Sequence, residues 1–228
     1  MSDEPLIAVV HSTTASISPT AAAFAAEFPG ARLWNLLDDR LGSDAETLGG
    51  VTPPLRDRML GLVRHGIDGG ADAVLMVCSM YGDTVEVADK LFLAPVTSSD
   101  ADMMDEIVRL APRRVAVLAS LHASAADSTN RLHEHLAANG AGIEVVPVFC
   151  DGAAAAAAAQ DRPGLVAALA AGVAGAGGEF DLLCIAQYSL SPVHDELAAA
   201  TGVAVVSPPR FAARSVASKI AASNEGRR

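Results

Sequence analysis

Asp72-Ala-Val-Leu-Met-Val-Cys78-Ser79 and Asp181-Leu-Leu-Cys-Ile-Ala-Gln187-Tyr188-Ser189 are two versions of one pattern. Each copy opens with an acidic residue, continues as an apolar run typical of a strand buried on both faces, and ends in polar residues. The second copy begins 109 residues after the first. The chain is therefore predicted to contain two similar halves.

Other segments repeat at nearly the same spacing. Residues 6–10 form an apolar run followed by hydroxyl-bearing and then helical sequence, and residues 115–119 follow the same plan. Residues 94–99 and 203–208 form a third pair, offset by 109 residues. Strands that alternate with helical patterns predict βαβ units, and hence an α/β fold with a parallel sheet in each half.

Two crossover helices stand out between these strands. Apolar residues at helical spacing between 55 and 63 indicate one of them. The alanine-rich stretch that starts at 153 and continues to Leu169 indicates another, with a low-complexity loop as the alternative for the alanine run.

Composition narrows the choice of partners and location. Of the 228 residues, 51% are hydrophobic and only 4% aromatic, which suits buried parallel strands and close-packed helices. The net charge of -11, without a basic stripe, argues against nucleic acid. No apolar run reaches the roughly 18 residues of a membrane span, and the acidic start is unlike a signal peptide, so we expect a cytoplasmic protein.

Cys78 is the first candidate for chemistry. It falls where a strand ends, and Ser79 and the turn-forming residues after it lead into a helical segment. In parallel sheets, ligands gather beyond the carboxyl ends of the strands. Backbone N–H groups at a helix start stabilise a thiolate and also bind a carboxylate. The alternative for Cys78 is an inert, buried thiol.

The order of the motifs resembles the aspartate/glutamate racemase superfamily over nearly the whole chain. The resemblance rests on the strand and turn repeated in both halves, on Asn35-Leu-Leu-Asp-Asp39, on Ala94-Pro-Val96, and on Ala186-Gln-Tyr-Ser189 followed by Val205-Val-Ser-Pro208. It implies two flavodoxin-like domains related by a pseudo-twofold axis, with the active-site cleft between them. The expected domains are residues 1–105 and 106–208, with a last helix, about 209–228, that packs back on the first.

The resemblance also implies proton transfer at the carbon beside a carboxylate, without a cofactor, between one cysteine from each half. Two groups are needed because inversion removes a proton from one face of the carbon and returns it to the other. The position equivalent to Cys78 in the second half is Gln187, which cannot act as an acid or base. Cys184 lies inside a strand run, and Cys150 matches no family position.

The missing second cysteine leaves three functions open. The leading one is a racemase or other isomerase that acts on a small carboxylate or amino acid, with Cys78 and Tyr188 as catalytic residues. Ser189 and His122 are the alternatives to Tyr188 as the replacement for the second cysteine. The second is a decarboxylase or lyase that uses Cys78 alone. The third is a binding module for small carboxylates, without catalysis.

The remaining candidates are predicted to bind the substrate through hydroxyl, amide or imidazole groups. No metal is expected, because the acidic residues between 100 and 106 lack His or Cys companions and are typical of a solvated helix face. The absence of a cofactor is what the family resemblance implies. The sequence is compatible with a homo-oligomer and does not identify the substrate. The predicted binding residues are His11, Ser12, Thr13, Ser79, Ser120, His122, Gln187 and Ser189.

Overall fold

The computed structural model describes residues 4–226, and the chain divides into two compact units. The first unit comprises the chain up to Asp100 together with the part from Pro209 on, and the second runs from Ala101 to Pro208. The boundary precedes a helix, so that this helix lies whole in the second unit, whereas the expected boundary at residue 105 falls inside it.

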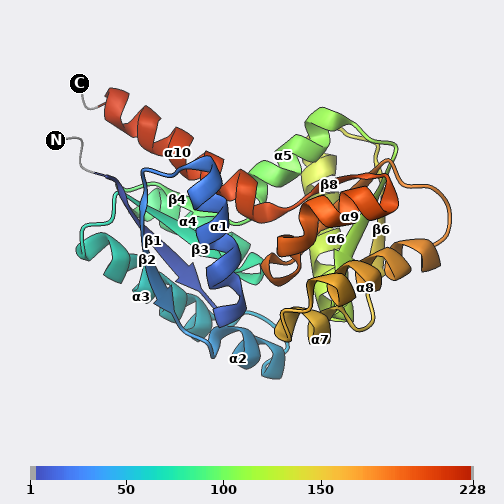
Figure 1. Ribbon diagram of the computed structural model, residues 1–228. Coiled ribbons are helices and arrows are strands. Elements are labelled where there is room, and N and C mark those ends of the chain that lie inside the picture. The colour runs from blue at the N-terminus through green and yellow to red at the C-terminus, as the bar shows by residue number, and fades with distance from the viewer. Residues whose placement is uncertain (1–3, 227–228) are drawn as a thin grey trace. The chain divides into compact units, whose positions relative to one another are not determined.

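The first unit is a parallel sheet covered by helices (Figure 1). Its strands are ordered β2-β1-β3-β4. In chain order the elements are β1 (Leu6–His11), η1 (Thr14–Ser16), α1 (Ile17–Glu27), β2 (Arg32–Leu37), α2 (Leu41–Thr47), α3 (Pro53–Asp68), β3 (Ala73–Val77), η2 (Ser79–Tyr81), α4 (Gly82–Leu91), β4 (Val96–Ser98) and α10 (Pro208–Gly226).

The second unit repeats this topology with the strand order β6-β5-β7-β8. The predicted α/β fold with two parallel sheets is therefore confirmed. The elements are α5 (Ala101–Leu110), β5 (Arg114–Ala119), α6 (His122–Ala138), β6 (Glu144–Phe149), α7 (Ala153–Ala158), α8 (Arg162–Gly175), β7 (Leu182–Ile185), η3 (Tyr188–Val193), α9 (His194–Thr201) and β8 (Ala204–Val206).

Each central strand is apolar because helices cover both faces of its sheet. In the first unit, α3 and α4 cover one face and α1 lies on the other (Figure 1). Right-handed crossovers require this arrangement, because β2 is added on one side of β1, whereas β3 and β4 are added on the other side. Gly66 lets α3 approach β1 closely, since a Cβ at this position would stand 2.6 Å from the Cβ of Ala8. The alanine run is helical, as predicted, rather than a loop, but the expected single helix is divided into α7 and α8, with a break at residues 159–161 where Gln160 has a positive φ.

The acidic residue that opens each half of the repeat has a structural task. Asp72 accepts a hydrogen bond from the backbone N–H of Leu6 at 2.8 Å. Asp181 accepts from the backbone N–H groups of Arg113 and Arg114 at 2.9 and 3.0 Å. In both units the carboxylate thus fixes the start of the neighbouring central strand, which explains why this residue recurs in the pattern.

Candidate functional site

Cys78 follows the central strand β3 and is half-buried. The chain turns at once into η2, in which the N–H of Tyr81 donates to the carbonyl of Cys78 at 3.1 Å, and α4 begins at Gly82. Tyr81 is the N-cap of α4 and makes no side-chain capping bond. The first-turn N–H groups of α4 are therefore not satisfied by a cap, and such groups favour an anion. The side chain of Ser79 lies outside what the structure describes.

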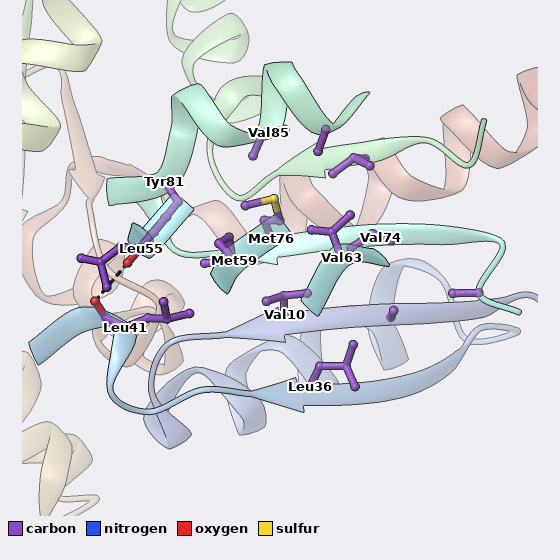
Figure 2. Packing of buried hydrophobic residues seen from close by; sticks show 14 of the residues in the cluster. Val10, Leu36, Leu41, Leu55, Met59, Val63, Val74, Met76, Tyr81 and Val85 are labelled. Carbon is purple, nitrogen blue, oxygen red and sulfur yellow. Dashed lines mark hydrogen bonds between the residues drawn. The ribbon is translucent and has the colours of Figure 1, made fainter. Parts of the chain in front are cut away.

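Tyr81 is the last residue of η2, and its side chain points into the core, with 1% of its surface exposed. Its ring packs in the apolar cluster shared by β1, β3, α3 and α4, and its hydroxyl donates to the carbonyl of Leu41 at 3.1 Å (Figure 2). Burial, and then the proximity of Cys78, raises the pKa of Tyr81 to about 12. The phenol therefore stays protonated at neutral pH and acts as a hydrogen-bond donor.

An arginine fork lies at the same edge of the sheet. Arg58 of α3 donates to both carboxylate oxygens of Asp38, at 2.8 and 2.5 Å, and to Asp44 of α2 at 2.6 Å. Hydrogen bonding to Arg58 lowers the pKa of Asp44. Because two carboxylates occupy this guanidinium, its charge is engaged in holding α2 against α3.

His11 is fully buried at the end of β1. Its Nδ1 lies 2.7 Å from the hydroxyl of Ser16, and its Nε2 lies 2.9 Å from Oδ1 of Asn35. Burial lowers its pKa, so the ring is neutral at pH 7. In this conformation His11 connects the segments after β1 and β2 and presents no surface to a ligand.

The two hydroxyl residues after His11 differ in their roles. Ser12 is half-buried, and Thr13 is exposed. The hydroxyl of Thr13 accepts a hydrogen bond from the N–H of Ala15 at 3.3 Å and caps η1. Capping does not exclude a second bond from the hydroxyl, so substrate binding by Ser12 and Thr13 stays a prediction.

In the second unit, Gln187 and Ser120 lie together at the carboxyl ends of β7 and β5. Oε1 of Gln187 accepts from the N–H of Ser120 at 2.7 Å and from its hydroxyl at 2.9 Å. Two donors on one atom identify that atom as the amide oxygen and leave the NH₂ as the donor end of the side chain. Gln187 is thus held as a hydrogen-bond donor, a group that suits a carboxylate and transfers no proton.

Three other candidates lie on nearby segments of this unit. Tyr188 begins η3 and is 8% exposed, and Ser189 beside it is half-buried. His122 is exposed at the start of α6 and stacks on Phe149, with ring centroids 3.9 Å apart. Ser120 therefore contacts Gln187, which Tyr188 and Ser189 follow directly in the chain, while the ring of His122 stacks on Phe149. Their contact with a substrate stays a prediction.

The other cysteines are unsuited to proton transfer. Cys184 lies in β7 with 3% of its surface exposed, as expected for a strand interior. Cys150 is fully buried, and burial raises its pKa to about 11. Cys78 is therefore the most accessible of the three thiols.

The described part of the chain has neither a candidate metal site nor a helix that could span a membrane. Over residues 4–226, the His, Cys, Asp and Glu side chains form no group of three or more that could hold a metal ion. No helix in the same range has both the length and the apolar character needed to cross a membrane. A hollow of about 430 Å³ runs along the edge strand β6, between Phe149 and the small residues of α8.

Solved structures with the same architecture include racemases. A glutamate racemase from Bacillus anthracis matches with a TM-score of 0.75 and 11% identity, covering 96% of this chain and 83% of that one. An aspartate racemase from Picrophilus torridus matches with a TM-score of 0.71 and 12% identity, covering 95% and 94%. The chain has the fold of the aspartate/glutamate racemase superfamily.

A decarboxylase shares this fold. An arylmalonate decarboxylase matches with a TM-score of 0.63 and 19% identity, covering 95% of this chain and 92% of that one. Neither a protein-family model nor a curated protein matches by sequence. At these identities the likeness concerns the fold alone, and the predicted resemblance is confirmed at that level.

Two features of the site were not predicted from the sequence. The burial of Tyr81 depends on α2 and α3, which are distant from it in the sequence. The fork of Arg58 was missed because its acceptors lie 20 and 14 residues away. The acidic pair Asp38 and Asp39 could have indicated this ion pair, because a partly buried carboxylate at a strand end is stable only with a partner.

Proposed function

We propose that the chain is a cofactor-independent enzyme that transfers a proton at the α-carbon of a small carboxylate or amino acid, with Cys78 as the acid/base. One observation carries the proposal: a half-buried thiol stands between the end of a central strand and a helix whose first turn lacks a side-chain cap. The shared fold with racemases and a decarboxylase supports it.

In the proposed reaction the thiolate of Cys78 removes the α-proton and becomes a thiol. The electron pair of the C–H bond moves into the carboxylate, which gains enediolate character. Backbone N–H groups of the first turn of α4 are the donors that would stabilise this added negative charge, because they are fixed in place before the reaction begins. Return of a proton to carbon completes the turnover.

The isomerase form of the proposal needs a second proton donor for the opposite face, and Tyr188 is the candidate. A phenol transfers protons when its surroundings tune it. Inversion then leaves Cys78 protonated and Tyr188 ionised until protons are exchanged with water.

A lyase form is favoured by the state of Gln187. Because Ser120 holds its amide oxygen, Gln187 offers only donor hydrogens at the position equivalent to Cys78. In decarboxylation the C–CO₂ bond breaks, its electron pair stays on the substrate as an enediolate, and the thiol of Cys78 supplies one proton to carbon. The product then has a single configuration.

The deciding experiment follows the α-proton in heavy water. The protein is incubated with D- and L-amino acids, 2-hydroxy acids and 2-substituted malonates, and ¹H NMR is combined with chiral chromatography. Exchange with inversion indicates an isomerase, and CO₂ release with one product configuration indicates a lyase. If no compound reacts, the proposal fails, and this outcome favours a binding module without catalysis.

The matched variants are Cys78→Ser and Cys150→Ser. The first should abolish turnover, while the second should retain it, because Cys150 is fully buried. Turnover that survives Cys78→Ser would remove Cys78 from the mechanism.

A further inference from the structure

We propose that Tyr81 is a positioning residue for Cys78. Its side chain couples the turn that carries the thiol to α2. This inference rests on the proposed function in one respect, namely that Cys78 is the reacting group. Tyr81 itself does not touch the substrate in this proposal. It acts by fixing the thiol relative to the first turn of α4.

The connection runs through one side chain. The backbone N–H of Tyr81 closes the turn on the carbonyl of Cys78, and the ring descends from that turn into the apolar cluster (Figure 2). Val85 and Met59 belong to the same cluster. At its far end the hydroxyl reaches the carbonyl of Leu41, the first residue of α2, at 3.1 Å. η2 has only three residues, and the ring of its last residue is buried in the core.

The other end of the connection is itself fixed. Leu41 is fully buried, and α2 is held to α3 by the bond between Asp44 and Arg58 at 2.6 Å. Arg58 also binds Asp38, which directly follows β2. The hydroxyl of Tyr81 thus bonds to an element that is anchored independently of the Cys78 turn. Loss of that bond would free the turn without removing the ring from the core.

The hydroxyl is suited to this role and not to proton transfer. Its pKa of about 12 keeps it protonated across the range in which a thiol works, so the bond to Leu41 persists. Tyrosine at this position supplies both the bulk that fills the core and the donor that reaches α2. Phenylalanine would supply only the bulk.

The test compares two alkylating reagents on Cys78, iodoacetate and iodoacetamide. In both, the thiolate sulfur forms a bond to the CH₂ carbon while the C–I bond breaks and iodide leaves with the electron pair. Only iodoacetate carries a carboxylate, which imitates the substrate group expected at the N–H donors of α4. The ratio of the two rates therefore reports how well thiol and donors are held together.

In Tyr81→Phe we expect the preference for iodoacetate to fall about threefold to tenfold relative to wild type, the range that one hydrogen bond commands. The saturation constant for iodoacetate should rise, because the carboxylate is held less well. A merely structural role would change the rates with both reagents by the same factor and leave their ratio unchanged.

Thr20→Val is the matched control. It removes another buried hydroxyl of the same unit, one that lies in α1 and donates to the carbonyl of Ser16 at 2.7 Å rather than to α2. Its melting temperature should fall about as much as that of Tyr81→Phe, and its reagent ratio should match wild type. Equal loss of the ratio in Thr20→Val would overturn the proposal.

A second variant examines the coupling to α2. Asp44→Asn weakens the contact of α2 with Arg58. As a single substitution it should lower the ratio of the iodoacetate rate to the iodoacetamide rate, whereas added to Tyr81→Phe it should cause no further loss. Additive losses would contradict coupling through Tyr81, and so would a wild-type protein without any preference for iodoacetate. Because labelling needs no substrate, absence of turnover would refute the proposed function and leave this result intact.

Discussion

Native alkylation should separate Cys78 from the other cysteines, and the structure sets the size of the difference. Burial raises the pKa of Cys150 from 9.0 to about 11. At pH 8 an ordinary thiol of pKa 9.0 is about one-tenth ionised, whereas Cys150 is about one-thousandth ionised. Since the thiolate is the nucleophile, ionisation alone slows Cys150 about a hundredfold relative to an ordinary thiol.

Access adds to this difference. Cys150 has no exposed surface and packs against Gly172, whose position leaves no room for a Cβ beside the Cys150 sulfur. Alkylation of Cys150 therefore requires local opening as well as ionisation. Cys78 is half-buried and meets the reagent in the folded state.

The assay is brief treatment with iodoacetamide at pH 8, followed by digestion and mass spectrometry of the three cysteine peptides. We expect Cys78 to be modified before either Cys150 or Cys184 is detectably labelled. In 8 M urea, at roughly the same reagent concentration, the three should react at similar rates. Native labelling of Cys150 as fast as Cys78 would refute the reasoning, because it would mean that burial neither raises the pKa nor limits access.

Three further predictions concern the same residues and their supports. The unfolded thiol of Cys150 ionises before the folded one, so stability is full below pH 9.0 and falls as pH rises toward about 11, by up to about 2–3 kcal/mol. Urea unfolding at several pH values should show a shallower alkaline loss in Cys150→Ala, and an unchanged loss would contradict this. A double-mutant cycle of Ser120→Ala and Gln187→Leu should give a coupling of about 1 kcal/mol in unfolding free energy, whereas additivity would deny the hydrogen bond. Gly66→Ala should cost about 1–3 kcal/mol, because its Cβ meets the Cβ of Ala8 at 2.6 Å, and an unchanged melting temperature would show that α3 shifts freely.

The central strands were predictable because they are buried on both faces and read as continuous apolar runs. β3 and β7 show this in the two copies of the repeat. β2 was not predicted as a strand, since it lies at the sheet edge and includes Arg32 and Asn35 among its apolar residues. Edge strands need only one partner and one covered face, so their sequence carries a weaker signal.

The candidate site was predictable only in part. Cys78 could be placed at a strand end from the repeat alone, and Gln187 followed from the same arithmetic. The tethers could not be derived in this way, because Tyr81 bonds to a residue 40 positions away and Gln187 to one 67 positions away. Local sequence indicates which side chains lie at the carboxyl ends of the strands, while long-range packing determines which of them are fixed by hydrogen bonds.

The two units share a topology but secure their equivalent positions by different means. In the first, the turn that carries Cys78 is held by Tyr81, whose N–H bonds to the carbonyl of Cys78 and whose hydroxyl bonds to the carbonyl of Leu41. In the second, Gln187 is itself the structural bond, since its oxygen satisfies both donors of Ser120. A cysteine at position 187 would therefore gain a thiol and lose that acceptor. This asymmetry explains in physical terms how equivalent positions of a repeated fold can hold a half-buried thiol in one unit and a fixed hydrogen-bond donor in the other.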